Sequence, residues 1–167
     1  MYLLDPAITS SRDEADGLRD VGPVVDALLR FGLAQDLRQH DGARELFESA
    51  FTEDAVLDFR PAAKACGLEV PLMVGRPMIT EVIMNPATLI DTTHVVTNPR
   101  VEVTGDAARL TALVEAQHLP RGDHSRHALL KNLYDVEAVR HDGLWRMRRV
   151  DIENVWFTGD PSVIVGR

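Results

Sequence analysis

The chain has 167 residues, of which 45% are apolar and 26% charged, a composition typical of one globular domain with a sizeable core. Its 18 basic and 26 acidic residues give a net charge of −8, which disfavours nucleic acid and anionic membrane surfaces as partners. Cys66 is the single cysteine, and neither a signal peptide nor a membrane-spanning apolar run is evident. We therefore expect a soluble, cytoplasmic protein.

The first predicted helix follows a polar stretch, residues 1–19, which we interpret as an N-terminal extension. From Asp20, apolar residues recur every three or four positions, a spacing that predicts an amphipathic helix with Asp20 as its N-cap. The same stripe carries Asp36, so this carboxylate is predicted on the buried-facing side of the helix.

Two further helices and one short strand are predicted before residue 90. The second helix covers residues 42–49, with Asp41 as its cap, and the short strand covers residues 55–59. Residues 60–76 are rich in Pro and Gly and are expected to be irregular. A third helix is expected to begin at Pro77 or Met78, because proline is tolerated in a first helical turn.

After Asp91 the apolar period changes from about 3.6 to two, which predicts strands. Hairpin turn sequences separate four of them and imply an antiparallel meander. The strands are predicted at residues 94–104, 107–119, 126–140 and 144–157. Helices followed by a long sheet indicate an α+β domain over residues 20–157, with a C-terminal tail over 158–167.

Polar side chains interrupt the apolar faces of two strands. His118 continues the face formed by Leu110, Ala112, Val114 and Ala116, and Asn132 and Tyr134 share the apolar face of the next strand. Taken singly, each is better explained as a hydrogen-bonded core residue than as a catalytic one. Together with Asp36 and His94 they resemble a pocket wall with a few placed polar groups. Two imidazoles and a carboxylate suit proton abstraction beside a carbonyl and return of a proton to a leaving hydroxyl.

Several short motifs resemble those of one superfamily in order and spacing. They are Ala34-Gln35-Asp36 with His40-Asp41, Leu57-Asp58-Phe59-Arg60, the strand opening Thr93 to Asn98, His127-Ala128 through Asn132-Leu133, and Asp142 to Arg146. Together they resemble the SnoaL-like and scytalone dehydratase-like branch of the nuclear-transport-factor-2-like superfamily. The resemblance implies a cone-shaped barrel, a strongly bent and mostly antiparallel sheet wrapped around about three N-terminal helices. It also implies chemistry without metal or organic cofactor.

The resemblance assigns roles to individual residues. Asp36 matches an aspartate that orients a pocket histidine, His118 matches that histidine, and His94 matches a second one. Asn132 matches a substrate-facing asparagine. Gln35 and Phe59 stand where the family has substrate-polarising tyrosines, so a different substrate is expected, and Tyr134 is a candidate replacement for them.

Three functions stay open on this evidence. The first is a dehydratase or isomerase acting on a hydrophobic, polyketide- or steroid-like small molecule. The second is a SnoaL-like cyclase or an epoxide hydrolase, the latter needing a second carboxylate and an arginine in the pocket. The third is a non-catalytic ligand-binding or dimerisation module. A homo-oligomer, dimer or trimer, is expected in each case, and residues 155–167 are expected to cover the pocket mouth or a neighbouring subunit.

Overall fold

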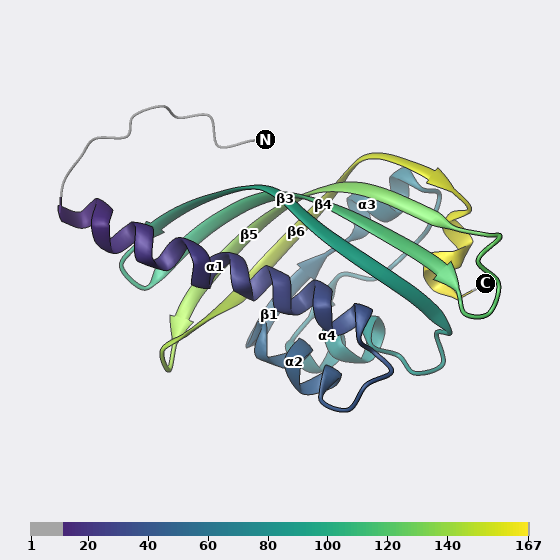
Figure 1. Ribbon diagram of the computed structural model, residues 1–167, viewed down its shortest axis with the longest axis horizontal. Helices are drawn as coiled ribbons and strands as arrows, with labels where there is room; N and C mark the ends of the chain where they lie inside the picture. The colour runs from purple at the N-terminus through teal and green to yellow at the C-terminus, as the bar shows by residue number, and fades with distance from the viewer. Residues whose placement is uncertain (1–11, 167) are drawn as a thin grey trace.

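The computed structural model describes residues 12–166 (Figure 1). Within that range the helices are α1 (Arg12–Asp36), α2 (Ala43–Ser49), α3 (Arg60–Ala65), α4 (Arg76–Ile83) and the 3₁₀-helix η1 (Pro161–Val165). The strands are β1 (Phe51–Asp58), β2 (Met73–Val74), β3 (Ile90–Thr104), β4 (Ala107–Pro120), β5 (Ala128–His141) and β6 (Leu144–Gly159). The predicted α+β class is confirmed.

The six strands form one bent sheet in the order β2-β1-β6-β5-β4-β3. β3 to β6 make the predicted meander, whereas β1 pairs in parallel with β6. The sheet is open, with β2 and β3 at its edges, so the expected barrel does not close by hydrogen bonding. Bulges assist the bend: the β3–β4 register shifts between Thr97 and Arg100, where Asn98 has φ 53°, and β6 is bulged twice against β5.

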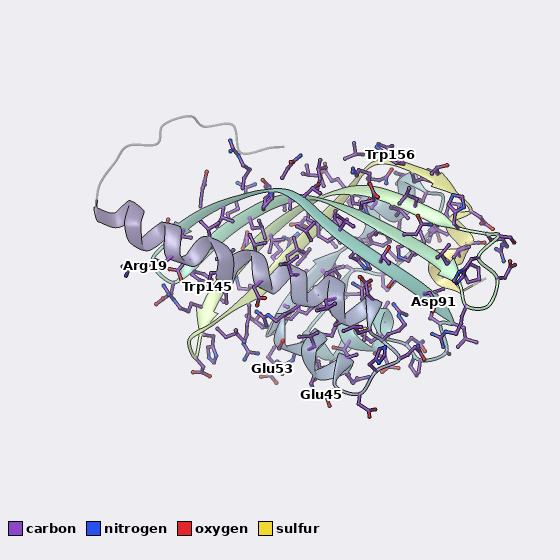
Figure 2. The ribbon with its side chains drawn as sticks, viewed as in Figure 1. Arg19, Glu45, Glu53, Asp91, Trp145 and Trp156 are labelled. Carbon is purple, nitrogen blue, oxygen red and sulfur yellow. The ribbon has the colours of Figure 1, made fainter. Side chains whose placement is uncertain are left out.

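Helix α1 lies across the bent sheet and contacts β3, β4 and β6 (Figure 1). It begins at Arg12, so the predicted start at Asp20 was wrong and residues 12–19 belong to the helix. Asp20 is not a cap, because its Oδ1 accepts hydrogen bonds from Arg140 Nη1 at 3.0 Å and Trp145 Nε1 at 3.1 Å. Figure 2 shows Trp145 beside this part of α1, at the opposite end of the sheet from Asp91. The rest of the predicted extension, residues 1–11, lies outside the described range.

The shorter helices differ from prediction mainly at their ends. α2 is preceded by Gly42 in the left-handed region, without a side-chain cap, so Asp41 does not cap it as predicted. α4 has proline in its first turn, as expected. α3 falls inside the segment predicted to be irregular, where Arg60 donates to the Asp58 carboxylate from its backbone and its guanidinium.

The alternation predicted for β4 and β5 is confirmed. Leu110, Ala112, Val114 and Ala116 are all buried on the inner face of β4. The corresponding residues of β5, Leu130, Asn132, Tyr134, Val136 and Ala138, are buried as well. These faces join Phe31 and Phe47 in the main core, where aromatic rings pack with centroids about 5.4 Å apart. The inner face of the sheet therefore carries both the core and the predicted polar residues.

The C-terminal segment folds back on the sheet near the α3 end (Figure 1). Val163 of η1 is fully buried in a second apolar cluster with Ile90, Ala128 and Leu130. Asp160 begins this turn by accepting hydrogen bonds from Ser162. None of the helices between residues 12 and 166 combines the length and apolar character needed to cross a membrane.

Candidate functional site

A cavity of about 240 Å³ opens between the inner face of the sheet, the C-terminal end of α1, helix α4 and η1. Most of its wall is apolar, and includes Phe31, Leu57, Met73, Ile83, Leu130 and Ile152. Its main polar side chains are Gln35, Arg38, His94, His118, Asn132 and Tyr134. A mostly apolar cavity with a few converging polar groups is the usual form of a small-molecule site.

Asp36 and His94 form a hydrogen-bonded pair at one end of this cavity. His94 Nδ1 lies 2.7 Å from Asp36 Oδ1, and the His94 backbone N–H donates to Asp36 Oδ2 at 2.9 Å. Thr92 Oγ1 also donates to Asp36 Oδ1, at 2.9 Å. The imidazole is almost fully buried, with 4% of its side chain exposed. In a neutral imidazole, a carboxylate that accepts at Nδ1 fixes the tautomer in which Nε2 is the ring nitrogen without a proton.

The pairing expected from the sequence, Asp36 with His118, was wrong. Asp36 is the last residue of α1. This helix packs against the edge strand β3, on which Thr92 and His94 point to the same face. Gly32 permits this approach, because a Cβ at that position would lie 2.9 Å from His94 Cβ. His118 is one strand further in, opposite Thr92 in the β3–β4 register.

The environment of Asp36 holds its carboxyl group in the ionised form. Burial acts to raise the pKa, but the hydrogen bonds and charge of His94, with the hydroxyl of Thr92, outweigh it and lower the pKa below its usual value. The pair is therefore a carboxylate that accepts from an imidazole, rather than a carboxylic acid.

His118 is the second imidazole of the cavity, with its ring centroid 6.0 Å from that of His94. Its Nδ1 is buried and has no hydrogen-bond partner among residues 12–166. Burial, followed by the charges of His94 and Arg38, lowers the pKa of His118 to about 3, against the opposing effect of the Ala128 and Ala116 carbonyls. The ring is thus neutral at physiological pH, and it offers an unused polar atom in an apolar setting.

Asn132 and Tyr134 lie next to each other on the inner face of β5. Asn154 Nδ2 donates to Asn132 Oδ1 at 2.9 Å, an orientation that turns the Asn132 NH₂ group into the available donor. A bulge in β6 aligns Asn154 with Asn132 across the strands. Tyr134 is buried beside Phe31, and burial raises the pKa of its phenol, so it is a neutral hydroxyl.

The remaining predicted residues, Gln35 and Phe59, also line the cavity. Gln35 Nε2 donates to the Phe31 carbonyl one turn earlier in α1, at 3.1 Å, so its Oε1 is the free end of the amide. Phe59 contributes only apolar surface. All seven predicted site residues are thus at the cavity or, for Asp36, directly behind one of its walls.

Three residues of the site were missed from the sequence. Thr92 lies two residues before His94 and shares its face, but the strand was predicted to begin at His94. Arg38 follows Gln35 by three residues. This spacing places both side chains on the same side of the chain at the C-terminal end of α1. Asn154 was hidden by the bulge, because a shifted register cannot be seen from alternation alone.

The chain is similar to known proteins in sequence and in fold. The profile of the SnoaL-like domain family matches residues 16–151. The chain is 32% identical over 165 residues to terrestric acid biosynthesis cluster protein E of Penicillium crustosum, covering 95% of this chain and 96% of that protein.

Two solved structures are similar in fold. A protein assigned as a scytalone dehydratase from Novosphingobium aromaticivorans has a TM-score of 0.70 at 18% identity, over 90% of this chain and 95% of the other. The hexachlorocyclohexane dehydrochlorinase LinA-type3 from Novosphingobium barchaimii has a TM-score of 0.69 at 20% identity, over 89% and 94%. At these identities the likeness concerns the fold.

Proposed function

This chain belongs to the SnoaL-like domain family, and we propose that it is a cofactor-independent dehydratase or isomerase acting on an apolar, polyketide- or steroid-like small molecule. The observation that carries the proposal is the Asp36–His94 pair at the wall of an apolar cavity. A histidine oriented by a carboxylate is a common general base in enzymes. The 32% identical relative, by its name, belongs to a biosynthesis cluster, which supports a role in the making of a small organic molecule.

In the proposed reaction, His94 Nε2 removes a proton from the carbon beside a substrate carbonyl. The C–H electron pair forms a carbon–carbon double bond and the carbonyl oxygen becomes negatively charged. Asp36 compensates the positive charge that the imidazole gains. The neutral His118 ring and the Asn132 amide are the donors that would hold the substrate oxygen.

The second half of the reaction returns the proton. When the carbonyl re-forms, the bond to the β-hydroxyl group breaks, and this oxygen takes the proton from His94 Nε2 and leaves as water. If no such hydroxyl is present, the proton returns to another carbon and the product is an isomer. One residue can serve as base and then as acid because the imidazole is protonated only between the two steps.

The product mass separates this proposal from the alternatives. Dehydration removes one water from the substrate, isomerisation and cyclisation keep the mass, and opening an epoxide adds one water. The arginine needed for an epoxide hydrolase is present as Arg38, but no second carboxylate lines the cavity in the part of the chain that the structure describes. The carboxylate of Asp58, which precedes the cavity residue Phe59, is bound by Arg60, and Asp58 does not line the cavity.

The test is an assay of Asp36→Asn against wild type on a panel of cyclic β-hydroxyketones. Products are followed by mass spectrometry and by the ultraviolet absorbance of the conjugated ketone. We expect turnover of the responsive substrate to fall by roughly 10²–10⁴-fold, the usual contribution of a positioned acid–base group. Asp58→Asn is the matched control, since it removes a carboxylate that the cavity does not use. Full turnover by Asp36→Asn would rule out this mechanism.

A further inference from the structure

We propose that Arg38 is a substrate-binding residue and that the cavity takes an anion, an apolar molecule with a carboxylate whose oxygens accept from the guanidinium. The inference rests on the proposed function only in using the same cavity, and it narrows the substrate class from a neutral ketone to an organic acid.

The first argument is the hydrogen bonding of Arg38 itself. The residue follows the end of α1 and lines the cavity. Its Nε donates to the Gln35 carbonyl at 3.1 Å, whereas its Nη1 is buried and has no partner among the described residues. Buried polar atoms are hydrogen-bonded in the great majority of cases, so an exception of this kind needs a reason.

The second argument is that the nearby carboxylates are bound to other groups. Asp36 accepts from Thr92 and His94, as described above. Asp91 accepts from Arg121 and His124. The charges of both carboxylates therefore act on Arg38, but neither carboxylate accepts a hydrogen bond from it. A partly desolvated guanidinium without an anion in contact is energetically unfavourable, and a ligand carboxylate would remove that cost.

The third argument is the set of residues that line the cavity together with Arg38. The charge of Arg38 acts on His118, whose Nδ1 also lacks a partner among residues 12–166. Two polar atoms without a partner among the described residues thus belong to side chains that line one cavity. The planar fork of an arginine matches the two oxygens of a carboxylate. The rest of the cavity is lined by residues such as Val82, Ile83 and Ile90, which suit an apolar ring or chain.

Long-range attraction does not explain an anion site in this protein. The chain carries a net charge of −8, which repels anions at a distance. Recognition of an anion must therefore come from local contacts, so substitution of Arg38 alone tests the inference.

The experiment uses cyclohexanecarboxylate and its neutral isostere, cyclohexanecarboxamide, as probes, and calorimetry or ligand-observed NMR measures their affinities. The wild-type protein should bind the carboxylate roughly 10–100-fold more tightly than the amide, as expected for charge-assisted hydrogen bonds. Arg38→Gln should remove that preference by weakening carboxylate binding far more than binding of the amide, whose carbonyl oxygen also accepts from the guanidinium. Arg38→Lys, which keeps the charge and loses the fork, should retain only part of it.

Arg121→Gln is the matched control. It removes a neighbouring positive charge that does not line the cavity, so it should keep most of the preference. Thermal unfolding checks that each variant is folded. Equal affinity for the two probes, no binding of the carboxylate, or a preference that survives in Arg38→Gln would each overturn the inference.

Because this readout is binding, it separates the two proposals. A protein that shows the Arg38-dependent preference but converts no β-hydroxyketone would retain the anion site and lose the dehydratase assignment. A protein that dehydrates neutral ketones and has no carboxylate preference would retain the dehydratase assignment and lose the anion site.

Discussion

At the scale of single residues, the two cavity histidines differ in what surrounds them. His94 has a carboxylate in contact, whereas His118 is buried near the charge of Arg38 and its Nδ1 has no partner among residues 12–166. A base that must accept a proton needs the first environment, and a neutral hydrogen-bond donor needs the second. This difference is the reason for giving the proton-transfer role to His94 and the oxygen-binding role to His118.

The buried His118 also predicts how stability depends on pH. Its pKa in the folded protein is about 3, below the ordinary value of 6.5, so between these values the unfolded chain binds more protons. Folding stability is therefore lost as pH falls below about 6.5, with a slope from this group approaching about 1.4 kcal/mol per pH unit. We expect His118→Gln to reduce the slope of the free energy of unfolding against pH by that amount between pH 6 and 4.

Urea unfolding at several pH values measures the effect, as the difference in free energy of unfolding between variant and wild type. The control is His141→Asn, which removes an exposed imidazole outside the cavity. Parallel curves for wild type and His118→Gln would contradict a depressed pKa at His118.

At the scale of elements, the packing of α1 on β3 decides the geometry of the acid–base pair. The helix brings Asp36 to a strand whose inner face carries Thr92 and His94. The contact is close at Gly32, where even a methyl group would meet the His94 side chain. A small residue at this point of the helix is therefore a requirement of the site, although glycine is a poor helix former.

Gly32→Ala is expected to damage the site while improving the helix. The added Cβ must push His94 by a few tenths of an ångström or more, and misplacement of a catalytic group can reduce turnover by about 10–100-fold. The hydrogen-bonded Nδ1 proton of His94, observed by NMR, gives a second readout that needs no substrate, and its signal should shift or disappear.

Gly22→Ala is the matched control in the same helix, because no atom lies within 4 Å of a Cβ at that position. This variant should be as active as wild type and slightly more stable, by about 0.5–1 kcal/mol. If Gly32→Ala behaves like Gly22→Ala, the close contact does not position His94.

At the scale of the whole molecule, the outer surface of α1 carries an apolar stripe. Leu29 and Leu33 of α1, and Leu37 directly after its last residue, recur every four residues and are 45%, 50% and 37% exposed. Contiguous exposed apolar side chains of this kind mark association surfaces more often than isolated ones. We therefore predict that this chain forms a homo-oligomer and that the stripe is its interface.

Sedimentation velocity of Leu33→Glu tests this expectation. In an oligomer, a glutamate at the centre of the stripe would be buried in the interface, so it should convert the oligomer to monomer. The chain should stay folded, since glutamate is a good helix former. Leu89→Glu is the control, because it charges an equally exposed leucine outside the helix. Wild-type protein that sediments as a monomer, or a Leu33→Glu variant that stays oligomeric, would exclude the stripe as the interface.

The sequence by itself determined which side chains share the inner faces of β4 and β5. A strand has a side-chain period of two, so Ala112 and Ala116 share one face of β4, and Asn132 and Tyr134 share one face of β5, without any tertiary information. The same reasoning found His118 and Asn132 inside an apolar surface, and the helical stripe carried Asp36 inward. Local periodicity was sufficient because each of these assignments concerns one element at a time.

Only the tertiary structure decided which groups meet. The partner of Asp36 depends on which strand lies under the end of α1, and the edge strand β3 supplies His94 there rather than His118. The start of α1, the parallel pairing of β1 with β6 and the bulge beside Asn154 also depend on contacts between distant segments. Arg38 became a candidate for the same reason, because only the contacts of the described residues show that its buried Nη1 has no partner among them.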